Sequence, residues 1–120
     1  AIAIVEEEIK EGKEWVVYLL NMKDCPINDT LVSSKGYGEI DQKMKKTTFF
    51  SHYLENLERQ SFKKIEIINE SVFGLTNEFF VTYYIDGVIH DKKYIFLPET
   101  IIQDNKTTIP LLNKKGIMIK

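Results

Sequence analysis

The sequence predicts an α+β fold, in which a mainly antiparallel sheet of about 6–8 strands carries one amphipathic helix over about residues 48–60. Apolar runs of strand length, separated by turn residues, recur along most of the chain, whereas only one segment has apolar residues at helical spacing. The connections between the runs are short, which favours antiparallel neighbours because a parallel pair needs a long crossover. No repeat or linker interrupts the 120 residues, so one domain over residues 1–120 is expected.

The first part of the chain predicts three strands. Residues 2–9 fit either a strand or a first helical turn, because the apolar start gives way to three glutamates. Residues 14–22 predict a strong strand, and the unbroken apolar run over residues 15–20 indicates burial on both faces. After a turn, Leu31–Lys35 is expected to pair back on this strand, and a glycine bulge or bend is expected to follow at residues 36–38.

The expected helix follows a polar loop at Asp41–Lys46. It would start at Thr48, with Thr47 or Thr48 capping its first turn, and end near Gln60. Large apolar side chains recur in this segment at three- and four-residue spacing, and on a helix they would form one buried stripe. They are Phe49, Phe50, Tyr53, Leu54 and Leu57.

The clearest local signal is Asp86-Gly87, which stands between two strand-like runs. Asp-Gly is typical of a two-residue type I′ hairpin turn, because both turn positions need positive φ. That turn makes Tyr83 face His90 on the opposite strand. The side of the hairpin expected in the core carries Phe79, Val81, Tyr83, Ile85, Val88, Tyr94 and Phe96.

Two further elements complete the prediction. A strand is expected at Lys64–Ile68, and a short C-terminal hairpin is expected from Thr108–Leu112 to Ile117–Lys120, with Gly116 in its turn. A single helix cannot cover so much apolar strand surface. We therefore expect a second copy of the chain, or a folded-over part of the sheet, to cover the remainder, and we expect a homodimer.

Composition and charge limit the partners. The net charge is −2, and Arg59 is the only arginine among the 16 basic residues. The balanced charge does not by itself imply a nucleic-acid partner. A single arginine disfavours sequence-specific reading of bases, because arginine is the usual reader of phosphate and of guanine, although lysines can still neutralise phosphates. No run reaches the roughly 18 apolar residues of a membrane span, and neither the N-terminal pattern nor the single cysteine, Cys25, indicates secretion. A cytoplasmic protein with no membrane partner is expected.

The most site-like stretch is Ser33–Gly38, which contains Lys35 and Tyr37. Glycines let backbone N–H groups approach an anion, and Lys35 could neutralise it. The spacing matches neither a phosphate-binding loop nor a dinucleotide fingerprint, and a strand with a glycine bulge and a packed tyrosine is the structural alternative. Lys35 and Tyr37 are the candidate binding residues. His90 is a third candidate, on a strand beside Tyr83.

No catalytic, metal or cofactor site stands out. Asp91 follows His90 on one strand, so their side chains point to opposite faces. His52, His90 and Cys25 lack the paired spacing of metal ligands, and no base or helix start adjoins Cys25. Several aromatic residues could stack on nucleic-acid bases, but no basic stripe accompanies them. These are Trp15, Tyr18, Tyr37, Phe80 and Tyr84.

Three stretches of the chain resemble a family of small, uncharacterised conserved bacterial proteins. They are residues 33–39 (SSKGYGE), residues 91–99 (DKKYIFLPE) and residues 109–116 (IPLLNKKG). Together they are spread over most of the chain. The resemblance implies no activity, cofactor or site residue, so it adds nothing to the three candidates above.

Three functional hypotheses follow from the sequence. The first is a non-catalytic binding or protein-interaction module that self-associates, because strand surface is in surplus and no catalytic set is assembled. The second is a small-molecule-binding protein or enzyme with a pocket near Lys35 and Tyr37, to which His90 contributes. The third is a non-specific single-stranded nucleic-acid binder, which would show a steep salt dependence.

Overall fold

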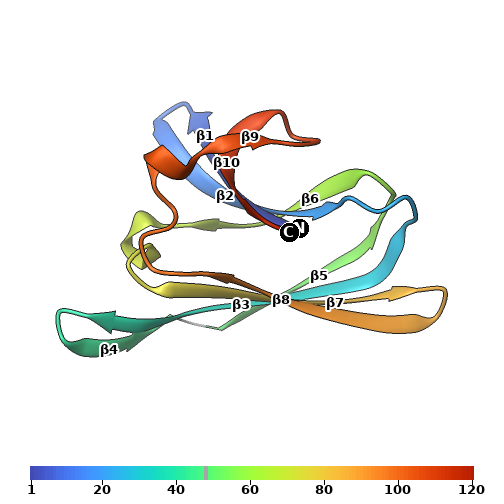
Figure 1. Ribbon diagram of the computed structural model, residues 1–120, viewed down its shortest axis with the longest axis horizontal. Helices are drawn as coiled ribbons and strands as arrows, with labels where there is room; N and C mark the ends of the chain where they lie inside the picture. Colours follow the sequence, from blue (N-terminus) through green and yellow to red (C-terminus); the bar gives the residue numbers. More distant parts are fainter. Residues whose placement is uncertain (48) are drawn as a thin grey trace.

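The computed structural model describes residues 1–47 and 49–120, and these form two stacked layers of strands (Figure 1). The strands are β1 (Ile2–Ile9), β2 (Gly12–Asn21), β3 (Ile27–Ile40), β4 (Lys43–Lys46), β5 (Phe50–Leu57), β6 (Ser61–Ile68), β7 (Thr76–Ile85), β8 (Val88–Phe96), β9 (Thr107–Ile109) and β10 (Lys114–Ile119). Two short 3₁₀ helices, η1 (Glu70–Val72) and η2 (Gln103–Asn105), complete the described elements. The predicted α+β class is therefore wrong, and the described part of the chain is nearly all β.

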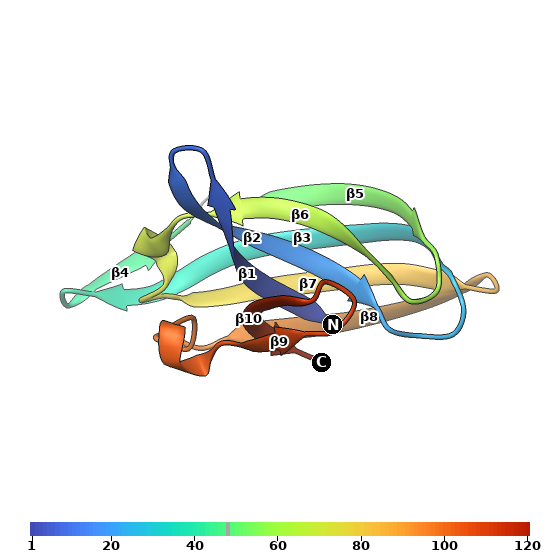
Figure 2. The same ribbon diagram turned by 90° about the horizontal axis from the view of Figure 1, so that it is seen from above.

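The ten strands form two antiparallel sheets. Sheet A has the order β6-β2-β1-β10-β9, and sheet B has the order β4-β3-β7-β8, with β5 also paired to β3. Seen from above, the strands of the two sheets lie across one another at an angle, and the two chain ends lie close together (Figure 2). The segment from β5 to β6 passes from sheet B to sheet A, which closes one side of the sandwich.

The predicted helix over residues 48–60 is wrong. Thr48, a predicted start and cap, lies outside the described residues, and the segment after it forms β5, paired antiparallel with β3. Leu54 and Leu57 are both buried, although alternation in a regular strand would put them on opposite faces. Between them Glu55 has a φ of +59°, and the register with β3 shifts there. Strand alternation interrupted by one bulge places Leu54 and Leu57, three residues apart, on the same face, which is also the spacing expected of a helix.

The pairing predicted for Leu31–Lys35 is also wrong. The chain after β2 crosses to the other sheet, so β3 pairs with β5 and β7. The strand does not break at its glycines, and its register with β7 continues through Gly36 without a shift. The Gly36 N–H donates to Thr47 Oγ1 at 2.6 Å, and a Cβ at Gly36 would lie 2.9 Å from Thr47 Cγ2. The glycine permits this close approach. Asp41–Lys46, expected to be a loop, instead contains a turn and β4.

The unbroken apolar run of β2 is buried on both faces, as predicted. Val17 and Leu19 face sheet B, whereas Val16 and Tyr18 face the other way and belong to a second apolar cluster. Sheet A curls over itself, so that β9, β10 and the turn between them cover the outer side of β1 and β2 (Figure 1). We expected either a second copy of the chain or a folded-over part of the sheet to bury the remaining apolar strand surface. On sheet A, the folded-over part of the sheet does so.

The main core lies between the two sheets. Phe79 and Phe96 meet edge to face with ring centroids 5.9 Å apart, and Trp15 contacts Phe73 in the same geometry at 5.2 Å. Such edge-to-face pairs add to the stabilisation from buried area. The largest fully buried core side chains, Phe96, Ile2, Ile4, Leu57, Val17, Val32 and Val81, come from both sheets.

The Asp86-Gly87 hairpin is confirmed. Asp86 has a φ of +49° and Gly87 a φ of +76°, and Tyr83 pairs with His90 as predicted. Most of the side predicted to be in the core is buried or half-buried. Val88, by contrast, is exposed beside the turn.

The C-terminal hairpin is confirmed between β9 and β10, but its turn is displaced from the predicted position. The residues with positive φ are Leu111 and Asn113, whereas Gly116 lies within β10, opposite Val5 of β1. A Cβ at Gly116 would lie 2.5 Å from the Ile4 carbonyl oxygen. Gly116 is therefore needed where β10 approaches β1, and not for the turn.

Two glutamates of β1 attach the C-terminal segment to sheet A. Glu6 accepts a hydrogen bond from Lys106 at 3.3 Å, and Glu7 accepts hydrogen bonds from Tyr18 at 2.8 Å and from Lys114. Burial raises the pKa of each carboxyl, but the hydrogen bonds and the lysine charges outweigh it, so both pKa values are lowered. Burial and the contact with Glu7 raise the pKa of Tyr18 to about 12.

Candidate interaction surface

The side of sheet B that points away from sheet A carries large apolar side chains that nothing in the described chain covers. Cross-strand pairing makes them neighbours, because Leu31 lies opposite Tyr53 and Tyr84 lies opposite Ile89. They are Leu31, Tyr53, Phe80, Tyr84, Ile89 and Ile95, each between 36% and 59% exposed. This surface is called the outer face of sheet B below.

One buried charge lies within this face. The Glu78 side chain on β7 is only 10% exposed, and its carboxylate lies 3.3 Å from Lys35 Nζ and 3.7 Å from Lys93 Nζ. The Tyr37 hydroxyl is 3.5 Å from the same carboxylate. Two lysines therefore share one glutamate, and an anion that approached this part of the face would compete with Glu78 for both ammonium groups.

A second polar contact lies at the β5 side of the face. The Tyr53 hydroxyl donates a hydrogen bond to Asp29 Oδ1 at 2.9 Å. This hydrogen bond and the charge of Asp29 raise the pKa of Tyr53. Tyr53 lies opposite Leu31 of β3 in the strand register.

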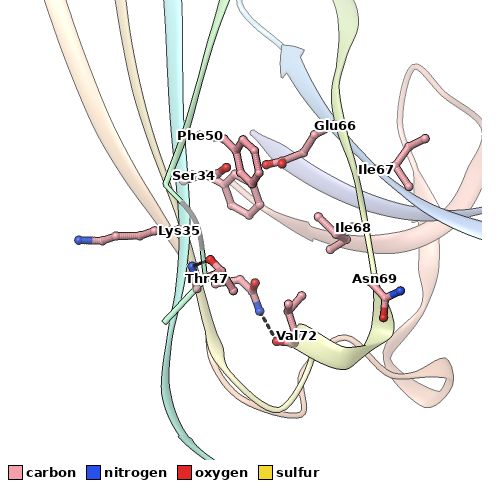
Figure 3. A pocket seen from close by; sticks show the side chains of 12 residues that line it. Ser34, Lys35, Thr47, Phe50, Glu66, Ile67, Ile68, Asn69 and Val72 are labelled. Carbon is pink, nitrogen blue, oxygen red and sulfur yellow. Dashed lines mark hydrogen bonds between the residues drawn. The ribbon is translucent and has the colours of Figure 1, made fainter. Parts of the chain in front are cut away.

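Lys35 and Tyr37, two of the predicted binding residues, lie together on the outer face of sheet B. Lys35 Nζ is 5.6 Å from the Tyr37 ring centroid, a cation–π distance. A shallow groove of about 290 Å³ runs beside them toward Phe49. The Lys35 side chain extends away from the cavity between the sheets, as Figure 3 shows, so it does not serve that cavity.

His90, the third predicted residue, lies elsewhere. Its ring stacks on that of Tyr83, with centroids 5.4 Å apart and an interplanar angle of 10°. Residues of β8 alternate between faces, so His90 is on the side of sheet B that faces sheet A, near the hairpin tip. The structure thus brings Lys35 and Tyr37 together but separates His90 from them.

A small cavity of about 150 Å³ lies between β3 and β6 (Figure 3). Glu66 reaches it because a bulge in β6 opposite β2 turns this carboxylate inward, where its Oε2 lies 3.8 Å from His52 Nε2. His52 Nε2 is buried and has no hydrogen-bond partner within the described chain. The Asn77 amide beside the cavity already donates to two carbonyls. This pair links the two sheets, and the cavity is too small for most metabolites.

The remaining sequence candidates do not converge. Cys25 is a half-buried free thiol, and its carbonyl accepts a hydrogen bond from the Asn21 amide. Over residues 1–47 and 49–120, no group of three or more His, Cys, Asp or Glu side chains is placed to hold a metal ion. Trp15 and Tyr18 are buried on opposite faces of β2, so the five aromatic residues considered for base stacking do not form one platform.

Sequence reasoning missed Glu78 and Glu66. The Asp86-Gly87 register already implied that Lys93 lies opposite Phe80, diagonal to Glu78, so the hairpin itself contained the signal for this ion pair. Glu66 gave no such signal. Its inward direction depends on a bulge that only the pairing of β6 with β2 reveals.

Comparison of the chain with protein-family models, with curated proteins and with solved structures finds no match. The function must therefore be argued from the surfaces themselves. Within the described residues, no helix has the length and apolar character needed to cross a membrane.

Proposed function

We propose that this protein is a non-catalytic interaction module that self-associates through the outer face of sheet B. The observation that carries the proposal is the set of six exposed apolar side chains that share this face, four of which form two cross-strand pairs. Monomeric soluble proteins rarely expose large contiguous apolar patches, and such patches mark interaction sites. A second copy of the same chain is the occupant that the geometry favours.

Size supports a second copy. Four strands about 4.8 Å apart, along the 46 Å long axis of the molecule, give a face of up to roughly 900 Å². Each partner of a standard interface contributes about 800 Å², so a stable dimer would use nearly the whole of this face. Two such sheets can pack face to face at a separation of about 10 Å, as sheets do within a β-sandwich.

Charge also supports a second copy. Glu78 already pairs with Lys35 and Lys93, so the face presents no strong field of one sign to its copy. The net charge of the chain is only −2, which keeps repulsion between copies small. The same internal pairing weakens the nucleic-acid alternative, because a phosphate would have to compete with Glu78 for both lysines.

Ile89→Lys tests the proposal, with Ile67→Lys as its matched control. Both isoleucines are on edge strands and are similarly exposed, at 56% and 52%, but Ile89 is on the outer face of sheet B and Ile67 is on β6 of sheet A. Sedimentation velocity from about 1 to 100 µM should show a wild-type dimer, a dimer for Ile67→Lys, and a dimer weakened at least tenfold for Ile89→Lys, because a buried unpaired charge is costly.

Two results would overturn the proposal. A wild-type monomer throughout that concentration range would remove the second copy. Equal dissociation of both lysine variants would show that the outer face of sheet B is not the interface. A wild-type monomer that binds a single-stranded oligonucleotide with steep salt dependence would assign the same face to nucleic acid instead.

A further inference from the structure

A second surface feature, separate from the outer face of sheet B, is a cleft between the sheets that is lined in part by Ala1 and Lys120. In Figure 1 the two chain termini lie side by side between the two sheets. Its volume is about 400 Å³, within the roughly 300–1,000 Å³ range of small-molecule sites. The walls include Leu19, Ile27 and Val81, which belong to the main core. The cleft therefore offers an apolar interior to a ligand.

The charged side chains that line this cleft all have the same sign. Lys23, Lys92 and Lys120 contribute to its lining, and the lining residues include no Asp or Glu. None of the three ammonium groups forms an ion pair or side-chain hydrogen bond within the described residues. Lys92 Nζ is instead 5.1 Å from the Tyr94 ring centroid. Three exposed ammonium groups without an anionic partner among the described residues therefore line an apolar cleft.

Two groups with shifted pKa values line the cleft. Burial, followed by the positive charges of Lys92 and Lys23, lowers the pKa of the Ala1 amino group to about 6. Burial raises the pKa of Tyr94. The Tyr94 hydroxyl has no hydrogen-bond partner within the described chain, so it remains available to donate to a ligand. The positive potential and the free donor favour an anion.

We propose that this cleft binds a small amphipathic carboxylate, with its apolar body between the two sheets and its carboxylate at Lys23 and Lys92. The apolar body would contact Leu19 and Val81. Tyr94 would donate a hydrogen bond to the carboxylate. The neighbouring Lys93 takes no part, because it points to the opposite face and pairs with Glu78.

Octanoate is a suitable probe, with octylammonium and 1-octanol as matched controls of opposite and zero charge. Titration of the full chain, followed by backbone amide chemical shifts, should give saturable changes at Leu19, Val81 and Tyr94. Octanoate should bind at least tenfold more tightly than 1-octanol, and octylammonium should bind more weakly still. Lys92→Met should weaken octanoate about tenfold, because it removes one ammonium group and keeps the chain length. Lys45→Met on β4, far from the cleft, should change nothing.

Three outcomes would overturn the proposal. They are no saturable shift up to about 10 mM octanoate, equal affinity for the three probes, and equal weakening by Lys92→Met and Lys45→Met. Ile89→Lys should leave octanoate binding unchanged. That arm separates this site from the proposed self-association surface, so either inference can fail alone.

Discussion

Replacing Val16 and Val17 separately by alanine tests whether β2 is buried on both faces. Both side chains are fully buried, Val17 in the main core between the sheets and Val16 in the outer cluster under the C-terminal hairpin. Each substitution removes two methyl groups, worth about 0.8 kcal/mol apiece, and leaves a cavity that adds up to roughly 1 kcal/mol. Each variant should therefore lose about 1.5–2.5 kcal/mol of its free energy of unfolding.

Equilibrium urea denaturation measures both losses, from the midpoint shift at an unchanged slope. In an ordinary sandwich one of these neighbours would face water, and its truncation would cost under about 0.5 kcal/mol. A small loss for Val16→Ala beside a large loss for Val17→Ala would refute the folded-over arrangement of sheet A. A small loss for Val17→Ala would instead refute the main core.

Two further predictions concern the bulge in β5 and the carboxylates of β1. Glu55→Gly should leave the free energy of unfolding unchanged or raise it by up to about 1 kcal/mol, because glycine adopts the positive φ at this position without strain. If the segment were a helix, the same substitution would destabilise the protein by a similar amount. Urea denaturation measures the sign of the change. The pKa values of Glu6 and Glu7 are lower in the folded chain than in the unfolded chain, so the unfolded chain binds protons first as the pH falls. The stability that the two carboxylates contribute is therefore present above about pH 5. It is lost as the pH falls below their ordinary pKa of 4.5. Glu7→Gln should reduce the drop in urea midpoint between pH 7 and pH 4, and an unchanged drop would contradict this account.

Local signals in the sequence were reliable where the causes were local. Asp86-Gly87 fixed its own hairpin because two adjacent residues supply both positive φ angles, and the register of β7 with β8 followed from it. The apolar run of β2 predicts burial on both faces, because residues 15–20 place no charged side chain on either face. Lys35 and Tyr37 lie on the same face of the sheet because they are two residues apart on one strand, which is also a local cause.

The prediction of a helix over residues 48–60 was wrong for a physical reason. Leu54 and Leu57 share a face only because of a bulge at Glu55, and that bulge exists only through pairing with β3. A periodicity read along the chain cannot distinguish such an interrupted strand from a helical turn. The choice of fold class therefore depended on a contact between two strands.

The amino-acid sequence by itself determined the antiparallel hairpins, the burial of β2 and the absence of a long apolar span, because each depends on neighbouring residues. Only the tertiary structure decided which strands pair, how sheet A folds over itself, and which side chains meet at Glu78 and at the cleft beside Lys92. These depend on where the chain crosses between the sheets. A crossing joins residues that are far apart in the sequence, and no local pattern of side chains encodes its direction.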